Sequence, residues 1–267
     1  MTYSASDRPW RDNALLAAWR AGRPTLNGWL AIPSGVSAEA MAAAGWDSLT
    51  LDLQHGMIDQ ADVLPLLQAL HGWPVTPLVR VPALDPGLIM KVLDLGAYGV
   101  ICPLIDTPEQ AAELVAACRY PPHGRRSFGP VRASLSIGAD YARRADQEIL
   151  CLAMIETRSA LERVAEICAV PGLSGIYIGP ADLSLALGVA PGFDPQEPVV
   201  CAAIERIIGC ARTAGIWVGV HNATPAYARR MVALGAHLVT VGSDLRLLGA
   251  AASQTVQAFR AGGAAHG

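Results

Sequence analysis

The chain has 267 residues, of which 52% are hydrophobic and 16% are charged, and its formal net charge is −3. This length allows one large α/β domain or two small ones, and the hydrophobic content is sufficient for a sizeable core. A nearly neutral chain lacks the basic surface that nucleic-acid-binding proteins use, and no apolar run approaches the ~20 residues of a membrane helix. We therefore expect neither nucleic acid nor a membrane as a partner.

Six cysteines are spread through apolar segments without forming a C-x-x-C pair, and the first residues do not have the pattern of a signal peptide. This arrangement predicts reduced, mostly buried thiols in a cytoplasmic protein. It does not have the Cys/His spacing of a zinc site.

Short β-rich runs alternate with segments of helical spacing along the whole chain. The N-terminal segment, 1–25, contains an amphipathic helix at 13–21 that precedes the first strand. Strands are predicted at residues 27–32, 48–53, 76–80, 98–102, 149–155, 175–178, 216–220 and 237–241. Helices are predicted at residues 37–44, 60–70, 86–95, 108–118, 158–168, 198–214, 225–234 and 245–260. The last residues, 261–267, are expected to form a frayed tail.

Eight nearly continuous apolar strands, each followed by a helix, indicate a parallel sheet that is covered on both faces. In about 250 residues this pattern favours a (β/α)₈ TIM barrel, which we predict as one domain over residues 1–267 with an N-terminal capping helix. A doubly wound open sheet is the competing fold, but it usually has fewer strands, and no G-x-G-x-x-G motif follows the first strand here. Several predicted helices stop at a glycine, namely Gly45, Gly96, Gly215 and Gly235.

The connection at residues 119–137 is long and irregular, and it contains the run PPHGRRSFGP. Connections of this length are usually functional, so we expect a subunit-contact loop near the site. Arg125 and Arg126 are interpreted as residues of a solvated face or of such a contact.

Polar side chains follow the predicted strands at the points where they end, whereas the strand interiors are apolar. In a barrel these ends meet on one face, where catalytic groups are found. The residues at these positions are Trp29, Asp52, His55, Arg80, Glu156, Asp182, His221 and Asp244. Asp244 is expected to cap the last helix, and His221 is either a supporting residue or an ordinary loop residue.

Glu156 and Asp182 follow adjacent predicted strands, so their carboxylates are expected to point into the same space. Unpaired carboxylates would repel each other, and a divalent cation removes that repulsion. Two carboxylates completed by water and substrate oxygens are a usual arrangement for a hard cation such as Mg²⁺. The alternative is that each carboxylate caps the helix that follows it.

The turn GPADLS, which begins at Gly179, is a second candidate site. Where the chain enters a helix after Pro180, the N–H groups of Ala181 and Asp182 lack helical partners and can bind a substrate carboxylate. The same pattern is compatible with an ordinary capped turn.

Arg80 ends an apolar strand, where it either stabilises negative charge on a substrate or forms a structural salt bridge. Asp52 and His55 lie three residues apart, just past another strand. A carboxylate that orients an imidazole produces a general base near neutral pH, although a histidine at such a position can also be structural.

The chain contains, in order, segments that resemble those of the HpcH/HpaI aldolase family of metal-dependent, class II pyruvate aldolases: GWL, LDLQHG, PLVRVP, RYPPHGRRS, MIET, IGPADLSLALG, GVHNATPAYARRMVALG and VTVGSD. The resemblance runs from about residue 26 to residue 244, and the GPADLS and D-x-x-HG motifs are its most specific parts. It implies a (β/α)₈ barrel that assembles as a homohexamer with helix exchange between subunits. The implied reaction is reversible cleavage of a 4-hydroxy-2-oxo acid to an aldehyde and pyruvate, or a related 2-oxo acid such as hydroxypyruvate.

Carried onto matching positions, the resemblance implies that Glu156 and Asp182 bind a divalent metal ion, with Mg²⁺, Mn²⁺, Co²⁺ and Zn²⁺ all open. It also implies that the N–H groups of Ala181 and Asp182, in the turn with Gly179 and Pro180, receive the carboxylate of pyruvate.

For the reacting centre, the resemblance implies that Arg80 steadies the enolate oxygen. His55, oriented by Asp52, is expected to act as the base, and Trp29 is expected to line the pocket.

Two positions depart from the family pattern. The first is Gln54, which stands where the family often has Glu.

The second departure is Met154, which stands where the family often has Gln and removes a hydrogen-bonding group from the site. The only lysine, Lys91, lies inside a predicted helix, which argues against an aldolase that works through a lysine Schiff base.

Three other functions remain open. They are an acyl-CoA lyase of the citrate-lyase-β or malyl-CoA type, a decarboxylase or hydratase acting on the same enolate, and a non-catalytic barrel that binds metabolites.

Overall fold

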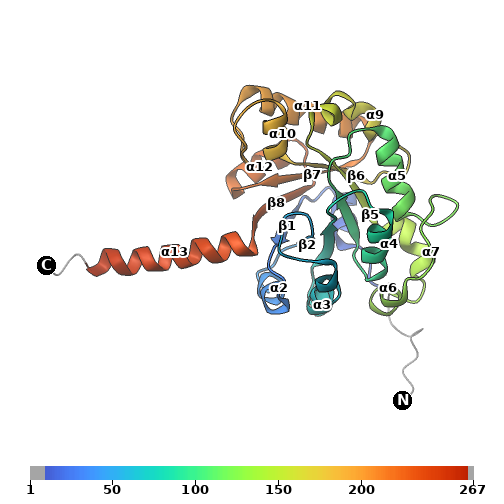
Figure 1. Ribbon diagram of the computed structural model, residues 1–267, viewed down its shortest axis with the longest axis horizontal. Coiled ribbons are helices and arrows are strands. Elements are labelled where there is room, and N and C mark those ends of the chain that lie inside the picture. The colour runs from blue at the N-terminus through green and yellow to red at the C-terminus, as the bar shows by residue number, and fades with distance from the viewer. Residues whose placement is uncertain (1–9, 264–267) are drawn as a thin grey trace, which may run out of the picture.

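Eight strands close into a barrel in which consecutive strands pair in parallel and β8 pairs with β1 (Figure 1). This computed structural model describes residues 10–263 of the chain. The strands are β1 Thr25–Leu30, β2 Ser48–Asp52, β3 Thr76–Arg80, β4 Gly99–Cys102, β5 Leu150–Ile155, β6 Gly175–Ile178, β7 Trp217–Asn222 and β8 Leu238–Ser243. The predicted (β/α)₈ barrel is confirmed, and the open sheet is excluded.

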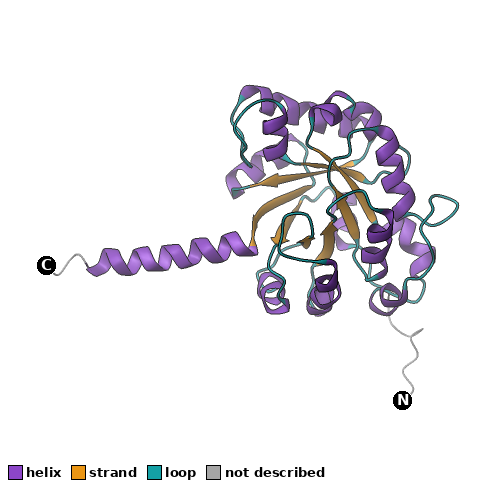
Figure 2. Cartoon of the chain, viewed as in Figure 1, coloured by secondary structure: helices purple, strands orange, loops and turns teal. Residues whose placement is uncertain are grey.

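Helices surround the strands and connect each one to the next (Figure 2). In the first half these are α1 Ala14–Arg20, α2 Gly35–Ala42, α3 Val63–Ala69, α4 Pro86–Asp94, α5 Pro108–Cys118, α6 Val131–Ser136 and α7 Tyr141–Glu148. In the second half they are α8 Arg158–Glu162, α9 Val164–Cys168, α10 Pro180–Ala186, α11 Pro198–Ala214, α12 Pro225–Leu234 and α13 Asp244–Gly263. Short 3₁₀ turns flank α3 at Gln60–Asp62 and Leu70–Gly72.

The predicted strands agree closely with the observed ones, since no strand end differs by more than about two residues, the usual uncertainty of element boundaries. The single helix predicted at 158–168 is wrong, because Arg163 adopts φ −100° and ψ 10° and separates α8 from α9. Residues 261–263 continue α13, and the rest of the predicted tail lies outside the described residues. The predicted glycine stops are confirmed by left-handed φ angles of 90°, 101°, 71° and 113° at Gly45, Gly96, Gly215 and Gly235.

The amino-terminal end of the barrel is closed by α1, as predicted. Leu15 and Trp19 of this helix are buried in one cluster with Leu78 and Leu150 from the barrel interior. Trp19 also donates its indole N–H to the hydroxyl of Thr25 at 2.8 Å. This apolar plug leaves the carboxyl-terminal end of the barrel as the open face, where sites of this fold are found.

The connection from α5 to β5 returns to the amino-terminal end of the barrel and includes α6 and α7, which were not predicted. Arg126 in this connection is only 1% exposed. It donates to Asp94 at 2.6 Å, and its guanidinium lies 4.7 and 5.3 Å from the ring centroids of Tyr120 and Tyr141. The prediction of a solvated face is therefore wrong for Arg126, because its ion pair with Asp94 and its contacts with two aromatic rings compensate the cost of burying its charge. Arg125, in contrast, is exposed.

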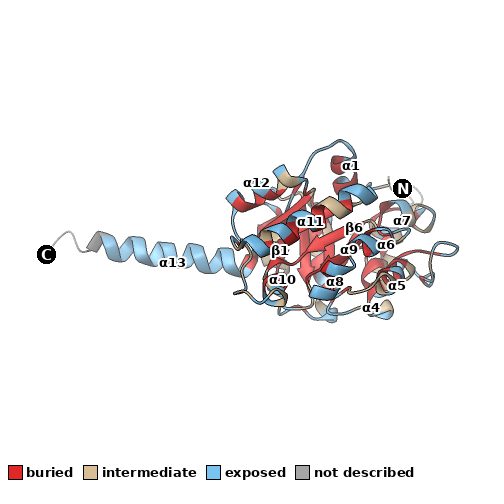
Figure 3. Cartoon of the chain, turned by 90° about the horizontal axis from the view of Figure 1, so that it is seen from above, coloured by how far each residue is buried: buried red, intermediate tan, exposed pale blue. Residues whose placement is uncertain are grey.

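The last helix, α13, projects away from the barrel, and its residues 245–261 are exposed (Figure 3). Its exposed side chains include Leu248, Val256 and Phe259, and Phe259 is 85% accessible. Within residues 10–263, no helix combines the length and the hydrophobicity needed to cross a membrane.

Candidate active site

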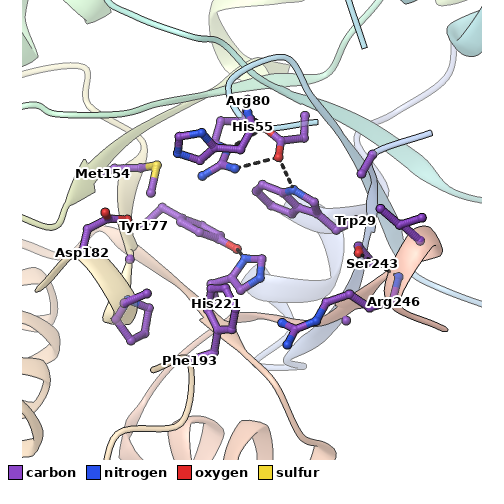
Figure 4. A pocket seen from close by; sticks show the side chains of 17 residues that line it. Trp29, His55, Arg80, Met154, Tyr177, Asp182, Phe193, His221, Ser243 and Arg246 are labelled. Atoms are coloured by element: carbon purple, nitrogen blue, oxygen red, sulfur yellow. Dashed lines mark hydrogen bonds and ion pairs between the residues drawn. The ribbon is translucent and has the colours of Figure 1, made fainter. Parts of the chain in front are cut away.

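The carboxyl ends of the strands surround a pocket of about 410 Å³ (Figure 4). This volume is typical of a small-molecule site. The predicted residues that line the pocket are Trp29, Asp52, His55, Arg80, Gly179, Pro180, Ala181 and Asp182. The connection at 119–137 contributes none of the lining residues. Its predicted place near the site is therefore wrong for the pocket of its own chain, because the connection returns to the opposite end of the barrel.

Asp52 and Arg80 form a buried two-point ion pair in the pocket wall. The parallel pairing of β2 with β3 places these two residues in register. Arg80 Nε donates to Asp52 Oδ1 at 2.9 Å and Nη2 donates to Oδ2 at 2.7 Å, while the guanidinium lies 4.9 Å from the centroid of the Trp29 ring. Burial raises the pKa of Asp52, but the hydrogen bonds and the charge of Arg80 outweigh it and hold that pKa below its ordinary value.

The predicted orientation of the His55 ring by Asp52 is wrong. Asp52 accepts hydrogen bonds from the backbone N–H groups of Gln54 and His55 at 3.1 and 3.2 Å, and from the indole of Trp29 at 3.0 Å. The register of β2 and β3 places the Asp52 carboxylate beside the guanidinium of Arg80 and not beside the His55 ring. The His55 imidazole has no hydrogen-bond partner among the described residues, and it lies exposed at the pocket (Figure 4).

Glu156 follows β5 directly behind the pocket lining and is 3% exposed. Its Oε1 accepts the backbone N–H of Leu104 at 2.9 Å. Its Oε2 lies so close to Gly179 that a Cβ at that position would be 2.6 Å away. Burial raises the pKa of Glu156 to about 7; the hydrogen bond from Leu104 opposes this rise, and the negative charge of Asp182 adds to it.

The two carboxylates fit a divalent cation. Asp182 lines the pocket and forms no salt bridge within the part of the chain that the structure describes. Burial and the negative charge of Asp182 both disfavour the ionised form of Glu156, and a cation bound between the two carboxylates would stabilise that form. No group of three or more His, Cys, Asp and Glu side chains between residues 10 and 263 could hold a metal ion. The protein would therefore supply two carboxylates, and water or substrate oxygens would complete the coordination.

The turn from Gly179 forms the pocket wall next to these carboxylates. Its first helical hydrogen bond runs from the N–H of Leu183 to the carbonyl of Gly179 at 3.0 Å. The N–H groups of Ala181 and Asp182 have no acceptor among residues 10–263, and both residues line the pocket. Binding of a substrate carboxylate by these two groups stays a prediction.

The pocket lining also includes residues that were not predicted, among them Tyr177, Phe193, Ser243, Leu245 and Arg246. Tyr177 lies in the apolar run of β6 and has the pattern of a core residue, while Phe193 lies in the connection between α10 and α11. Arg246 lies in the first turn of α13. Only the closed barrel brings these distant segments together.

His221 belongs to β7 and lines the pocket, so it is not a loop residue. Its Nδ1 lies 3.2 Å from the hydroxyl of Tyr177, and its ring packs edge-on against Trp29 with centroids 4.9 Å apart. Burial, assisted by the charge of Arg80, lowers the pKa of His221 to about 3. His221 is therefore a neutral hydrogen-bonding group.

Three further predicted positions are resolved by the structure. Met154 lines the pocket, whereas Gln54 does not, and the side-chain oxygen of Gln54 is buried without a partner among the described residues. Asp244 accepts the N–H of Leu245 but also that of Ala31, both at 2.8 Å. It is therefore more than a helix cap, because it ties the loop after β1 to the start of α13.

Comparisons with known proteins show similarity in sequence and in fold. The family model for HpcH/HpaI aldolase/citrate lyase matches residues 28–251. The chain is 43% identical to a hydroxypyruvate/pyruvate aldolase of Rhizorhabdus wittichii, over 93% of this chain and 99% of that protein. It is 40% identical to a 4-hydroxy-2-oxo-heptane-1,7-dioate aldolase of Shigella sonnei, over 94% of this chain and 96% of that protein. A solved HpcH/HpaI aldolase/citrate lyase family protein from Burkholderia cenocepacia is similar with a TM-score of 0.86 at 33% identity, covering 93% of this chain and 99% of that one.

Proposed function

Because this chain belongs to the HpcH/HpaI aldolase/citrate lyase family, we propose that it is a divalent-metal-dependent aldolase. The proposed reaction is reversible cleavage of a 4-hydroxy-2-oxo acid to an aldehyde and pyruvate or hydroxypyruvate. The names of the relatives support a carbon–carbon lyase that acts on 2-oxo acids. The observation that carries the metal-dependent form is the pair of Glu156 and Asp182, neither of which forms a salt bridge within residues 10–263.

In the proposed complex, the N–H groups of Ala181 and Asp182 bind the carboxylate of the 2-oxo acid. Arg80 offers the N–H groups that Asp52 does not use to the keto oxygen, where negative charge develops as the C3–C4 bond breaks. Asp52 fixes the direction of that guanidinium through two hydrogen bonds. Trp29 packs against it and keeps water from one side of the site.

A divalent cation held by Glu156 and Asp182 would supply Lewis-acid polarisation of the keto oxygen. During cleavage His55 takes the proton of the 4-hydroxyl group, and the electron pair of the C3–C4 bond passes into the enolate. A proton is then delivered to C3 of the enolate, which gives pyruvate. During condensation a proton leaves C3 of pyruvate to form the enolate, and His55 donates a proton to the new hydroxyl group. His55 suits this role because its imidazole lines the pocket and forms no hydrogen bond with any residue between 10 and 263, whereas the ring of His221 lies within hydrogen-bond distance of the Tyr177 hydroxyl.

The direct test is aldol condensation of pyruvate with a panel of aldehydes in the presence of Mg²⁺, Mn²⁺, Co²⁺ or Zn²⁺. We expect EDTA to abolish product formation and added cation to restore it. Borohydride with pyruvate should leave no adduct, because Lys91 is the only lysine and lies exposed on α4. Activity that resists EDTA, or pyruvate trapped on Lys91, would contradict the proposal. Turnover of acyl-CoA esters in place of free 2-oxo acids would favour the acyl-CoA lyase alternative.

We further propose a homo-oligomer, a hexamer, in which α13 packs on a neighbouring subunit. The support is the exposure of Leu248, Val256 and Phe259 on a helix that leaves its own barrel. Light scattering should give the mass of an oligomer for the wild type and a smaller particle for Phe259→Glu. A monomeric wild type would contradict this proposal.

A cytoplasmic location is also proposed. The six cysteines are all free thiols, which is the state that a reducing compartment maintains. Measurement of free thiols on protein isolated under alkylating conditions should give six per chain, and disulfide-linked protein would contradict the location.

A further inference from the structure

The charges of the pocket are separated onto two walls. Asp52 and Arg80 neutralise each other in the wall formed by β2 and β3. Asp182 stands on one side with the turn that is proposed to hold the 2-oxo acid, and Arg246 stands on the opposite side (Figure 4). The guanidinium of Arg246 is therefore a positive charge in the pocket that has no role in the proposed reaction.

Arg246 is held in the pocket wall by contacts that leave its charge unpaired. Its backbone N–H donates to the hydroxyl of Ser243 at 3.4 Å, and its guanidinium lies 5.0 Å from the centroid of the Phe193 ring. No Asp or Glu within residues 10–263 forms an ion pair with it. A ring contact steers the guanidinium without neutralising it, so its N–H groups remain available to an anion inside the pocket.

The residues around Arg246 restrict the kind of ligand that its guanidinium can bind. Phe193 and Leu245 supply apolar lining on this side, and His221 supplies a neutral imidazole. A neutral lining with one unpaired guanidinium favours a short carbon chain that ends in a negative group. The pocket volume of about 410 Å³ leaves room for such a chain beyond a three-carbon 2-oxo acid.

We propose that Arg246 determines acceptor specificity by binding a carboxylate or phosphate group at the far end of the aldehyde. This assignment rests on the proposed function, because it takes the wall with Asp182 as the place of the 2-oxo acid. The aldehyde carbon then lies between the two walls, and its anionic end contacts the guanidinium. Arg246 takes no part in bond making, so its contribution belongs to binding of the aldehyde.

The experiment compares aldehydes that differ in charge. Condensation with pyruvate is measured for 4-oxobutanoate against butanal, and for D-glyceraldehyde 3-phosphate against D-glyceraldehyde. Each pair is tested on the wild type and on Arg246→Met, Arg246→Lys and Arg229→Met. Arg229 is the matched control, because it is an exposed arginine on α12 that does not line the pocket.

We expect the wild type and Arg229→Met to prefer the anionic member of at least one pair by about tenfold or more in kcat/KM. Arg246→Met should remove that preference through a raised KM for the anionic aldehyde with little change in kcat. Arg246→Lys should keep part of it, and the pair with the larger ratio identifies the anionic group.

Two outcomes overturn different parts of this account. A wild type that condenses both members of each pair equally well, or a preference that survives Arg246→Met, would overturn the assignment of Arg246 alone. A wild type that forms no carbon–carbon bond with any of the four aldehydes and any divalent cation would overturn the proposed function, and the acceptor assignment with it.

Discussion

The carboxylate of Glu156 occupies space that Gly179 leaves free, since a Cβ at Gly179 would lie 2.6 Å from Glu156 Oε2. The backbone at Gly179 has a φ of −99°, which other residues also adopt. Glycine is therefore required here by the close approach of a carboxylate and not by backbone conformation. The position of one proposed metal ligand thus depends on the absence of a side chain at the start of the next turn.

The substitution Gly179→Ala tests this dependence. The new methyl group would push the Glu156 carboxylate out of place, so we expect affinity for Mn²⁺ to fall about 10- to 100-fold, as for other groups that support metal ligands. Isothermal titration calorimetry measures the change. Gly209→Ala is the control, because Gly209 lies in α11, where an added Cβ would meet no neighbouring atom within 4 Å. It should leave Mn²⁺ affinity unchanged, and equal affinity in Gly179→Ala would contradict the proposed ligand.

The pH dependence of metal binding follows from the raised pKa of Glu156, which is about 7. Below that pH the carboxyl group is protonated and a cation must displace the proton, so affinity rises with pH and levels off above pH 7. For one such group, the dissociation constant for Mn²⁺ should be about tenfold larger at pH 6 than at pH 8. The exposed Glu162→Gln should keep this dependence and Glu156→Gln should lose it. Wild-type affinity that is the same at both pH values would contradict the role of Glu156.

Asp52 is expected to stabilise the fold as well as the site. In Asp52→Asn the buried guanidinium of Arg80 loses its counter-charge, so the free energy of unfolding should fall by about 3 kcal/mol in urea denaturation. The kcat/KM should fall by roughly 10²-fold because Arg80 is no longer aimed at the keto oxygen. In Asp140→Asn the broken pair with Arg143 is exposed, and stability should change little. An Asp52→Asn protein as stable as this control would show that the pair contributes little.

His55 is expected to act in proton transfer rather than in structure. His55→Asn should reduce kcat by about 10²- to 10⁴-fold, the usual contribution of a general base. Mn²⁺ affinity and thermal stability should stay unchanged, since the ring of His55 has no hydrogen-bond partner among the described residues. His123→Asn, which alters an exposed histidine paired with Asp146, should have wild-type kcat. A His55→Asn enzyme with wild-type kcat would require another base.

The barrel could be predicted from the sequence because each strand is a short apolar run bounded by turn residues, and the order of runs and helices determines a parallel sheet. The residues at the strand ends could be predicted for the same reason. Trp29, Asp52 and Arg80 lie at the carboxyl ends of their strands, Asp182 follows β6, and all four line the pocket.

The pairing between these side chains could not be predicted, because it depends on strand register. Only the register of β2 with β3 sets Asp52 opposite Arg80 and leaves the His55 ring free. In the same way, Arg126 is buried by rings from segments on either side of it. Arg246 has no local sequence signal, since an arginine in the first turn of an exposed helix normally faces solvent.

The most direct test of the central claim is exchange of the C3 protons of pyruvate into D₂O, followed by proton NMR without any aldehyde. Exchange requires the enolate alone, so it isolates the step that the proposed metal site serves. We predict exchange by the wild type with added Mg²⁺ or Mn²⁺, and loss of exchange in EDTA and in Glu156→Ala and Asp182→Ala. Exchange at the wild-type rate in EDTA, or in either variant, would contradict a reaction that depends on a cation held by these two carboxylates.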